Sequence, residues 1–286
     1  MKDQNQKYVR KPEWLRIKMT KAQDYRHVKG FLSPGGLHTI CESGACPNKG
    51  ECWAAGTATF MILGNICTRN CRFCNVPSGR PLPPDPEEPA RVAQAVQAMN
   101  VKHCVITSVD RDDLPDGGAG IWAETLKRIH EAAPEATIEA LIPDFGGKQS
   151  DILTVLNAKP DVISHNLETV RRLTPEVRSV ANYDTSLGVL EFIAGHSGIR
   201  TKSGIMLGLG ETEGEILETM DDLLQVNCQV LTLGQYLQPG RDHLPVEKYI
   251  HPDDFRRYGE IARKKGFRFV ESAPLVRSSY HAENHV

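Results

Sequence analysis

Residues 41–74 read CESGACPNKGECWAAGTATFMILGNICTRNCRFC, and this stretch holds six of the eight cysteines in the 286-residue chain. The six cysteines form a first trio of Cys41, Cys46 and Cys52, and a second trio of Cys67, Cys71 and Cys74. Packing alone would not gather cysteines in this way. Thiolates at such short spacings are typical ligands of zinc or of iron–sulfur clusters. The stretch therefore predicts two metal-binding groups.

The second trio has no fourth cysteine beside it. An iron–sulfur cluster is normally held by four cysteines, so a cluster on three of them leaves one iron open. A zinc ion with three protein ligands is likewise catalytic, because its fourth position stays available to substrate. An open iron can be chelated by the amine and the carboxylate of a small molecule. The second trio therefore predicts a catalytic cluster rather than a structural one.

Disulfide bonds and structural zinc account for the cysteines less well. Disulfide bonds need an oxidising compartment, and the N-terminal residues MKDQNQKY lack the apolar segment of a secretion signal. Structural zinc is the stronger alternative, but it favours pairs of C-x2-C, and two trios divide badly into quartets. The remaining cysteines, Cys104 and Cys228, lie in apolar runs and are predicted to be core residues.

The C-x3-C-x2-C spacing of the second trio, with Phe73 just before the last cysteine, resembles the signature of radical S-adenosylmethionine (SAM) enzymes. The resemblance implies that Cys67, Cys71 and Cys74 hold a [4Fe-4S] cluster whose open iron binds SAM. It gives these three cysteines a catalytic role and places Phe73 at the bound SAM. In such enzymes an electron from the cluster cleaves SAM to a 5′-deoxyadenosyl radical.

The first trio, with its C-x4-C-x5-C spacing, and the tail sequence Arg277-Ser278-Ser279-Tyr280 together resemble the lipoyl synthase family. The resemblance extends from about Pro34 to Tyr280. It implies a second, auxiliary [4Fe-4S] cluster held by the first trio. In this family the second serine of the tail motif is the fourth ligand of the auxiliary cluster, which makes Ser279 both a ligand and a catalytic residue.

The same resemblance implies a reaction. A lipoyl synthase inserts sulfur at C6 and C8 of an octanoyl chain on a lysine of a carrier domain, using two SAM molecules and sulfur from the auxiliary cluster. A radical is needed because no side-chain base can remove a proton from a saturated carbon. The cofactor carries that step, while the protein orients it and excludes water. A serine ligand, weaker than a fourth cysteine, would let the auxiliary cluster release its sulfide.

The resemblance also implies partners. The expected substrate is an octanoylated lipoyl carrier domain, either the E2 subunit of a 2-oxoacid dehydrogenase or the glycine cleavage H protein. An electron donor such as flavodoxin or ferredoxin and an iron–sulfur carrier that rebuilds the auxiliary cluster are expected as well. Another radical SAM enzyme that inserts sulfur or methylthio groups is the nearest alternative function. An electron carrier or a zinc-stabilised interaction module is the alternative from a different class.

The composition limits the remaining partners. The formal net charge is −2, and hydrophobic residues make up 40% of the chain. Such a charge gives no general attraction to nucleic acid or to a membrane surface. No apolar run approaches the ~20 residues that span a bilayer. The sequence therefore predicts a cytoplasmic monomer without nucleic-acid or membrane partners.

Residues 1–30 are locally basic, with nine Lys and Arg residues against three Asp and Glu residues. The simplest interpretation is a solvated arm packed by Trp14, Leu15 and Ile17. The alternative is a docking surface for an acidic protein, because a basic strip accelerates the encounter with such a partner.

Apolar β-rich runs alternate with helical patterns along the rest of the chain. Strands are predicted at 59–63, 103–108, 136–141, 161–165, 200–207 and 229–235, and helices at 87–99, 120–132, 149–158, 186–196, 213–226 and 252–265. Strands that are each followed by a helix predict a parallel sheet with right-handed crossovers. Six such units are too few for a closed eight-stranded barrel, so the predicted α/β fold is a partial, open (β/α)6 TIM-like barrel. The predicted domains are an N-terminal cluster-binding extension (1–56), the barrel (57–265) and a C-terminal tail segment (266–286) that returns to the first trio.

Ligands of such sheets bind where the parallel strands end. Ser108 and Asp110 follow the second predicted strand, and their hydroxyl and carboxylate groups suit the SAM ammonium group. Asn166 and Glu168 follow the fourth, in a segment that resembles the family's HNxET motif, whose Asn and Glu face SAM. Arg178 comes next and offers a bidentate match to the SAM carboxylate. Helix capping is the alternative role of the carboxylates and hydroxyls.

Two later segments complete the predicted SAM site. The sequence GIMLGLGE at 204–211 resembles the GxIxGxxE strand of radical SAM enzymes, with Met206 at the Ile position. Glycine at position 208 would let the backbone approach adenine closely. Gln238 lies where the last predicted strand ends, near the same rim. Met206, Gly208 and Gln238 are therefore predicted SAM contacts.

Overall fold

A computed structural model describes residues 10–16, 36–44, 46, 48–54, 57–178, 180–196 and 198–286. Most of the basic residues at 1–30 lie outside these ranges. Of the predicted arm, the structure describes the short 3-10 helix η1 (Glu13–Leu15). Leu15 is buried, and the ring of Trp14 meets that of His251 edge-on at 5.0 Å. These two side chains pack as predicted, whereas the position predicted for Ile17 lies outside the described residues.

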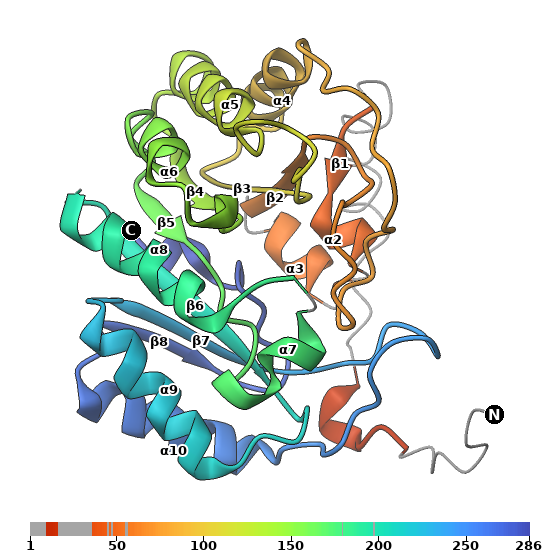
Figure 1. The fold of residues 1–286 in the computed structure, drawn as a ribbon, viewed down its shortest axis with the longest axis vertical. Coiled ribbons are helices and arrows are strands. Elements are labelled where there is room, and N and C mark those ends of the chain that lie inside the picture. Colours follow the sequence, from red (N-terminus) through yellow and green to blue (C-terminus); the bar gives the residue numbers. More distant parts are fainter. Residues whose placement is uncertain are drawn as a thin grey trace.

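The strands form one sheet in which neighbours in space follow the order of the chain, β1 to β8. They are β1 (His38–Thr39), β2 (Thr57–Ile62), β3 (His103–Ser108), β4 (Thr137–Leu141), β5 (Val162–Ser164), β6 (Arg200–Leu207), β7 (Val230–Gln235) and β8 (Phe269–Ser272). β2 to β8 are parallel, and β1 runs antiparallel to β2. Because the sheet has two edges within the described chain, it is a partial barrel and not a closed one (Figure 1).

Six helices connect the parallel strands: α4 (Glu88–Ala98), α5 (Ala119–Ala132), α6 (Gln149–Leu156), α8 (Tyr183–His196), α9 (Glu213–Gln225) and α10 (Pro252–Lys265). Shorter elements are α2 (Ile40–Ser43), α3 (Lys49–Ala54), η2 (Phe145–Gly147), η3 (Arg171–Leu173), α7 (Thr174–Val177) and η4 (Ala282–His285). The six long helices run along the outside of the sheet, which they cover from solvent (Figure 1). α2 and α3 contact β2, near the edge of the sheet that β1 forms.

The six predicted strand–helix units are confirmed, and the fold is the predicted open α/β barrel. The count of six strands was incomplete, because β1 and β8 extend the sheet at its two edges. β1 has two residues, too few for any periodic pattern. β8 lies in the segment predicted only as a returning tail, just after Gly266 ends α10 with a φ of +123°. β1 was missed because it is shorter than the patterns that predict strands, and β8 because its residues were assigned to the tail.

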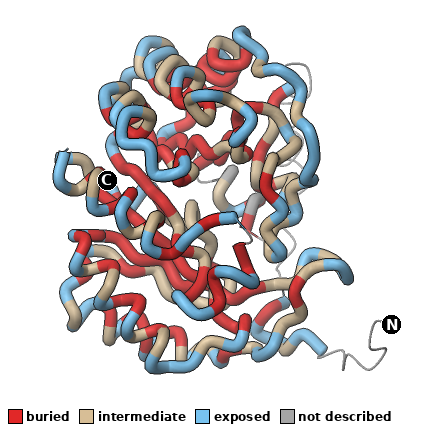
Figure 2. Tube along the Cα trace, viewed as in Figure 1, coloured by how far each residue is buried: buried red, intermediate tan, exposed pale blue. Residues whose placement is uncertain are grey.

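The hydrophobic core lies between the sheet and the long helices. Figure 2 shows buried residues along the strands, whereas exposed residues recur along the helices. Cys104 and Ile106 of β3 pack in one cluster with Trp122 and Leu126 of α5, so Cys104 is the core residue that was predicted. Cys228, in a second cluster, is likewise buried. Because side chains alternate along a strand, the residues between these apolar positions point to the inside of the barrel.

Polar groups occupy the inside of the barrel. Lys202 of β6 and Glu139 of β4 form an ion pair of 2.8 Å, with both side chains 0% exposed. Ser164 of β5, the strand between them, donates a hydrogen bond of 2.5 Å to the same carboxylate. Burying an ion pair costs desolvation free energy, and further hydrogen bonds to its carboxylate offset part of that cost. Ser164 supplies such a hydrogen bond here.

None of the helices in the described ranges is both long enough and apolar enough to cross a lipid bilayer.

Candidate functional site

The second trio lies in a loop that begins just beyond the C-terminal end of β2. The loop closes on itself: the Cys67 amide donates to the Pro77 carbonyl at 2.8 Å, and the Cys67 carbonyl accepts from Gly79 at 2.9 Å. The sulfur of Cys67 accepts hydrogen bonds from the amides of Arg69 at 3.4 Å and Asp110 at 3.3 Å. Backbone amides directed at a sulfur stabilise its thiolate form, so this loop is suited to metal ligation.

Arg69, between the first two cysteines of the loop, connects the loop to two neighbouring strands. Its guanidinium donates two hydrogen bonds to Asp112, at 2.9 and 2.7 Å, and two to Asp144, at 2.8 and 2.7 Å. It also lies 3.3 Å from a carboxylate oxygen of Asp110. Asp110 and Asp112 follow β3, Asp144 follows β4, and only 6% of the Arg69 side chain is exposed. Neither Arg69 nor Asp144 was predicted from the sequence as a site residue.

The thiols of the second trio lie in a buried region with negatively charged groups nearby. Burial raises the pKa of Cys71 to about 12 and that of Cys74 to about 11, and it also raises the pKa of Cys67. The Asp110 carboxylate raises the pKa of all three thiols further, and the nearby thiols add to the shift at Cys71 and Cys74. The trio therefore needs added positive charge to ionise, which bound iron supplies because metal binding displaces the thiol protons.

A second group of predicted residues lies inside the barrel, after β5. Asn166 donates a hydrogen bond of 3.1 Å to the carboxylate of Glu168. The backbone of Glu168 has a φ of +67° and is held by hydrogen bonds to Gly204 at 3.0 Å and from Met206 at 2.8 Å. Burial raises the pKa of the Glu168 carboxyl, against the lowering effects of Arg178 and Asn166. The carbonyl oxygen of the Asn166 side chain is buried without a partner among the described residues, so it is available to a ligand.

Arg178 is buried where α7 ends. Its Nη1 donates to the Leu167 carbonyl at 3.3 Å and to the Ser186 hydroxyl at 3.0 Å. Its charge lowers the pKa of Cys71, Asp110 and Glu168, so the guanidinium faces the space that these three groups surround. A guanidinium has five donors, and the two neutral partners leave the fork able to receive a carboxylate.

Four further residues that were predicted to contact SAM lie in different surroundings. Phe73 and Met206 pack against one apolar cluster, made of Val170, Leu173, Val177, Leu209, Tyr236 and Leu244. The Asp110 carboxylate is engaged by Arg69 and lies 3.7 Å from the Cys67 sulfur. The Ser108 hydroxyl accepts from the Trp122 indole at 3.2 Å, on the helix side of the sheet. Ser108 is therefore not brought to the group around Arg178.

Gly208 and Gln238 belong to the rim of the barrel. A Cβ at Gly208 would lie 2.3 Å from both the Gln235 side chain and the Lys248 carbonyl, so the glycine is needed for packing of the chain itself. Gln238 donates to the His243 carbonyl at 3.1 Å. His243 in turn contacts the Cys74 carbonyl at 2.9 Å, which ties this rim to the second trio. Neither Gln235 nor His243 was selected from the sequence.

The first trio is carried by α2 and α3, which pack beside β2. Cys41 is in α2 and Cys52 is in α3, and the Cys46 amide donates to the Cys41 carbonyl at 3.0 Å. Burial raises the pKa of Cys52 to about 12, and the thiols of Cys46 and Cys41 raise it further. The three thiols therefore lie close enough to interact, as the three thiols of the second trio do.

The C-terminal tail reaches this first trio. Asn48, between Cys46 and Cys52, donates to the Leu275 carbonyl at 2.6 Å. The Thr59 hydroxyl on β2 donates to the Ser279 hydroxyl at 3.1 Å, and the Tyr280 hydroxyl donates to Glu51 at 3.3 Å. Segments more than 200 residues apart in the chain thus meet beside β2.

The donor sets fit iron–sulfur clusters. All eight cysteines lie in the described part of the chain, and none of them forms a disulfide. No three His, Cys, Asp or Glu side chains of the described residues converge on the position of a single metal ion. Within each trio the thiols lie close enough to raise one another's pKa, and closely spaced cysteine thiolates are the usual ligands of iron–sulfur clusters.

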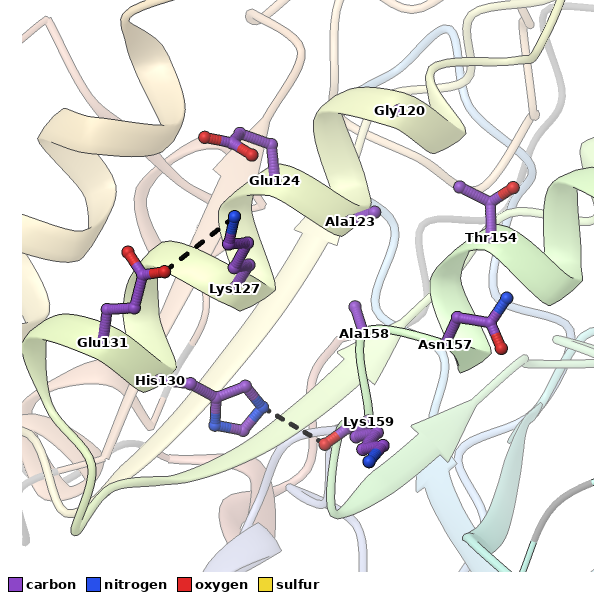
Figure 3. A pocket seen from close by; sticks show the side chains of 10 residues that line it. All are labelled: Gly120, Ala123, Glu124, Lys127, His130, Glu131, Thr154, Asn157, Ala158 and Lys159. Carbon is purple, nitrogen blue, oxygen red and sulfur yellow. Dashed lines mark hydrogen bonds and ion pairs between the residues drawn. The ribbon is translucent and has the colours of Figure 1, made fainter.

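A cavity of about 690 Å³ lies elsewhere, on the outside of the barrel between α5 and the end of α6 (Figure 3). Small and charged side chains line it, including the Lys127–Glu131 pair at 4.0 Å and His130, which contacts the Lys159 carbonyl at 3.2 Å. It shares no residue with either trio or with the predicted SAM contacts.

Comparison with known proteins identifies the class and then the family. A profile of the Radical SAM superfamily matches residues 61–223. The chain is 59% identical to the lipoyl synthase of Bacteroides fragilis strain YCH46, over 99% of this chain and 98% of that protein. It is 60% identical to the lipoyl synthase of Phocaeicola vulgatus, over 98% of each chain. The profile and the open barrel define a radical SAM protein. Within that superfamily, the chain belongs to the lipoyl synthase family.

Solved structures share the fold. Streptococcus suis SuiB bound to S-adenosylmethionine matches with a TM-score of 0.60 at 13% identity, over 88% of this chain and 56% of that one. The FeFe-hydrogenase maturase HydG of Carboxydothermus hydrogenoformans matches with a TM-score of 0.59 at 14% identity, over 92% of this chain and 77% of that one. The chain thus spans little more than half the length of SuiB. At these identities the likeness concerns the fold alone.

Proposed function

We propose that this chain is a radical SAM sulfurtransferase that inserts two sulfur atoms, at C6 and C8, into an octanoyl chain on a lysine of a lipoyl carrier domain. Its cofactors are SAM and two [4Fe-4S] clusters. The observation that carries the proposal is the arrangement around β2. The first trio packs beside this strand together with the tail serine, and the second trio lies just beyond the end of the same strand.

The two trios have separate roles in this proposal. When bound, SAM and its cluster supply hydrogen-atom abstraction, and the auxiliary cluster supplies sulfur. Cys67, Cys71 and Cys74 hold the cluster that binds SAM. The first trio and Ser279 hold the auxiliary cluster. An oxygen ligand at Ser279, weaker than a fourth thiolate, would favour release of sulfide from the cluster held there.

The residues after β5 orient SAM. Arg178 pairs with the SAM carboxylate through its guanidinium fork, which a lysine would not reproduce. The unpartnered oxygen of Asn166 and the neighbouring Glu168 carboxylate accept hydrogen bonds from the polar groups of SAM. Asp110 pairs with Arg69 near Cys67. Gly208 and Gln238 support the rim, and Ser108 bonds to Trp122 on the helix side, so none of these three touches the reacting atoms.

Apolar side chains exclude water from the reaction. Phe73 and Met206 border the buried cluster of Val170, Leu173, Val177, Leu209, Tyr236 and Leu244, and Phe73 belongs to the loop of the second trio. Water must be kept away from a radical because it opens side reactions. These residues therefore shield the radical between its formation and the attack on the octanoyl chain.

Three kinds of partner protein belong to the proposal. The carrier is an E2 subunit of a 2-oxoacid dehydrogenase or the glycine cleavage H protein, the electron donor is a flavodoxin or ferredoxin, and an iron–sulfur carrier restores the auxiliary cluster. The enzyme acts as a monomer in the cytoplasm, where a reducing medium preserves thiols and clusters. The chain divides into an extension (1–56), a barrel (57–265) and a tail segment (266–286).

The test is a single-turnover reaction under anaerobic conditions. Reconstituted protein, SAM, reductant and an octanoylated carrier peptide are incubated, and the mass of the peptide is measured by mass spectrometry. The expected result is a peptide carrying two added sulfur atoms. Cys104→Ala, which changes a core cysteine outside both trios, serves as the control and should retain sulfur insertion. Cleavage of SAM without any sulfur in the peptide would contradict the proposal.

A further inference from the structure

Gly234 lies on the inner face of β7, directly under the C-terminal tail. Leu231 and Leu233 of this strand pack into the outer core, so the alternating positions point inward. A Cβ on Gly234 would lie 2.1 Å from the carbonyl oxygen of Val276 and 3.0 Å from its carbonyl carbon. The φ of Gly234 is not in the left-handed region. Glycine is therefore needed here for clearance and not for backbone conformation.

The tail is held by hydrogen bonds at the two residues that precede this contact. The Gln235 amide donates to the Pro274 carbonyl at 3.2 Å, which extends the β7 ladder to the tail. Asn48, buried beside the first trio, donates to the next carbonyl, that of Leu275. The side chain of Val276 is itself buried. The backbone at 274–276 is thus held between β7 and the first trio, so it cannot yield freely to a larger residue at 234.

Further along, the tail crosses β2 from the inside. The Thr59 hydroxyl donates to Ser279, and the Thr57 hydroxyl donates to Glu283 at 3.1 Å. Thr59 is buried, so its hydroxyl has a fixed direction. Ser279 therefore sits between two fixed points, the Val276 contact on β7 and the Thr59 hydroxyl on β2.

We propose that Gly234 and Thr59 are positioning residues for Ser279 and set the depth at which its hydroxyl meets the first trio. The inference rests on the proposed function, in which Ser279 is the fourth ligand of the auxiliary cluster. Gly234 acts through clearance, because any side chain would push the Val276 carbonyl away from β7. Thr59 acts through its hydrogen bond, which orients the hydroxyl that ligates iron.

The expected displacement is large on the scale of a metal–ligand bond. To reach even 3.0 Å from an added Cβ, the Val276 carbonyl oxygen must move by about 0.9 Å. Ser279 follows three residues later and has a one-carbon side chain with little reach of its own. Functional groups must be held within about 0.5 Å of their productive position, so a shift of this size removes the ligand.

The test measures cluster content in reconstituted protein. In Gly234→Ala, we expect iron and sulfide to fall by about half, with the iron lost from the auxiliary cluster by Mössbauer spectroscopy. SAM cleavage to 5′-deoxyadenosine should stay within about twofold of the unsubstituted protein. Gly188→Ala is the matched control, because a Cβ at Gly188 in α8 meets nothing within 4 Å, and its iron content should not change. A full complement of iron in Gly234→Ala would overturn the inference.

A second variant keeps the test decisive if Gly234→Ala does not fold. Thr59→Val preserves the shape of the side chain but removes the hydrogen bond to Ser279, and it should also lose auxiliary iron. Thr59→Ser, which keeps the hydroxyl, should restore it. Full auxiliary iron in Thr59→Val would overturn the role of Thr59 as a positioning residue.

Ser279→Ala separates this inference from the proposed function. If Ser279→Ala loses auxiliary iron while Gly234→Ala and Thr59→Val keep it, the positioning roles are wrong and the ligand assignment stands. If Ser279→Ala itself keeps all its iron and still transfers sulfur, the ligand assignment fails first. If Gly234 acts through Ser279, adding Gly234→Ala to Ser279→Ala should cause no further loss, as expected for two changes on one path.

Discussion

Cys67 is the cysteine of the second trio with the most polar surroundings. Two backbone amides donate to its sulfur, while the Asp110 carboxylate lies 3.7 Å away. The amides favour the thiolate and the carboxylate opposes it. Arg69 contacts Asp110 as well as Asp112 and Asp144, so it balances much of the negative charge beside this ligand. The geometry of the cluster loop thus depends on a residue that ligates nothing.

Replacing Arg69 should destabilise the whole protein. Arg69→Met leaves the carboxylates of Asp110, Asp112 and Asp144 without their shared partner, and breaking a buried pair in this way costs about 3–5 kcal/mol. Urea unfolding of the metal-free protein measures the loss. Arg91→Met, which removes an exposed pair with Asp85, is the control and should cost less than about 1 kcal/mol. Equal stability of the two variants would show that the Arg69 network contributes no more than a surface pair.

The two trios should be separable by substitution. Cys71→Ala should abolish 5′-deoxyadenosine formation, because in the proposed function it removes a ligand of the cluster that binds SAM. Cys46→Ala should leave SAM cleavage measurable but stop sulfur insertion, because it affects only the auxiliary cluster. Chromatography of 5′-deoxyadenosine and mass spectrometry of the carrier peptide report the two activities. If folded Cys46→Ala loses SAM cleavage and sulfur insertion equally, the two trios do not have separate roles.

The elements of the barrel were predictable from the sequence to different degrees. The strand predicted at 200–207 has the bounds of β6, because its second half is mostly apolar and glycines follow it. β8 was missed because the residues after Gly266 were assigned to the returning tail, although FRFV at 267–270 alternates as a strand does. In the site, the cysteine spacings predicted two trios. The partnership of Arg69 with Asp144 was not predictable, because 75 residues separate them and only the adjacency of β3 and β4 brings them together.

The buried ion pair between β4 and β6 should contribute to the stability of the barrel. Lys202 and Glu139 pair across β5 with no exposure to solvent. Lys202→Met should lower the free energy of unfolding by about 3–5 kcal/mol, because it leaves a buried carboxylate with Ser164 as its remaining hydrogen-bond donor. Denaturant unfolding measures this loss. Adding Glu139→Gln should recover at least half of it, since the uncompensated charge is then gone. A double variant no more stable than Lys202→Met would contradict this account of the pair.

At the scale of the whole molecule, the tail joins the parts of the chain into one body. It contacts the first trio through Leu275, β2 through Ser279, and β6 through the hydrogen bond from Arg200 to the His285 carbonyl. The tail segment is therefore joined by hydrogen bonds to the barrel and to the described part of the N-terminal region.

Burial lowers the pKa of three histidines, His103, His165 and His285, which should make the stability of the protein sensitive to mild acid. Burial lowers the pKa of His165 to about 4 and that of His285 to about 3. The positive charge of Arg178 lowers the pKa of His165 further, against the raising effect of the Ile142 carbonyl at 2.9 Å. An unfolded histidine has a pKa of about 6.5. The folded state therefore binds these protons less readily than the unfolded state.

Because the unfolded state binds these protons more readily, lowering the pH destabilises the fold. Stability is at its full value above about pH 6.5 and falls as the pH drops from 6.5 toward 4, by up to about 1.4 kcal/mol per pH unit for each histidine. Urea unfolding of the metal-free protein between pH 7 and 5 measures the slope. His165→Gln removes one titrating group and should make the slope shallower by up to about 1.4 kcal/mol per pH unit, whatever its effect on stability at pH 7. A flat profile between pH 6.5 and 5 in the unsubstituted protein would mean that none of these histidines is kept neutral by the fold.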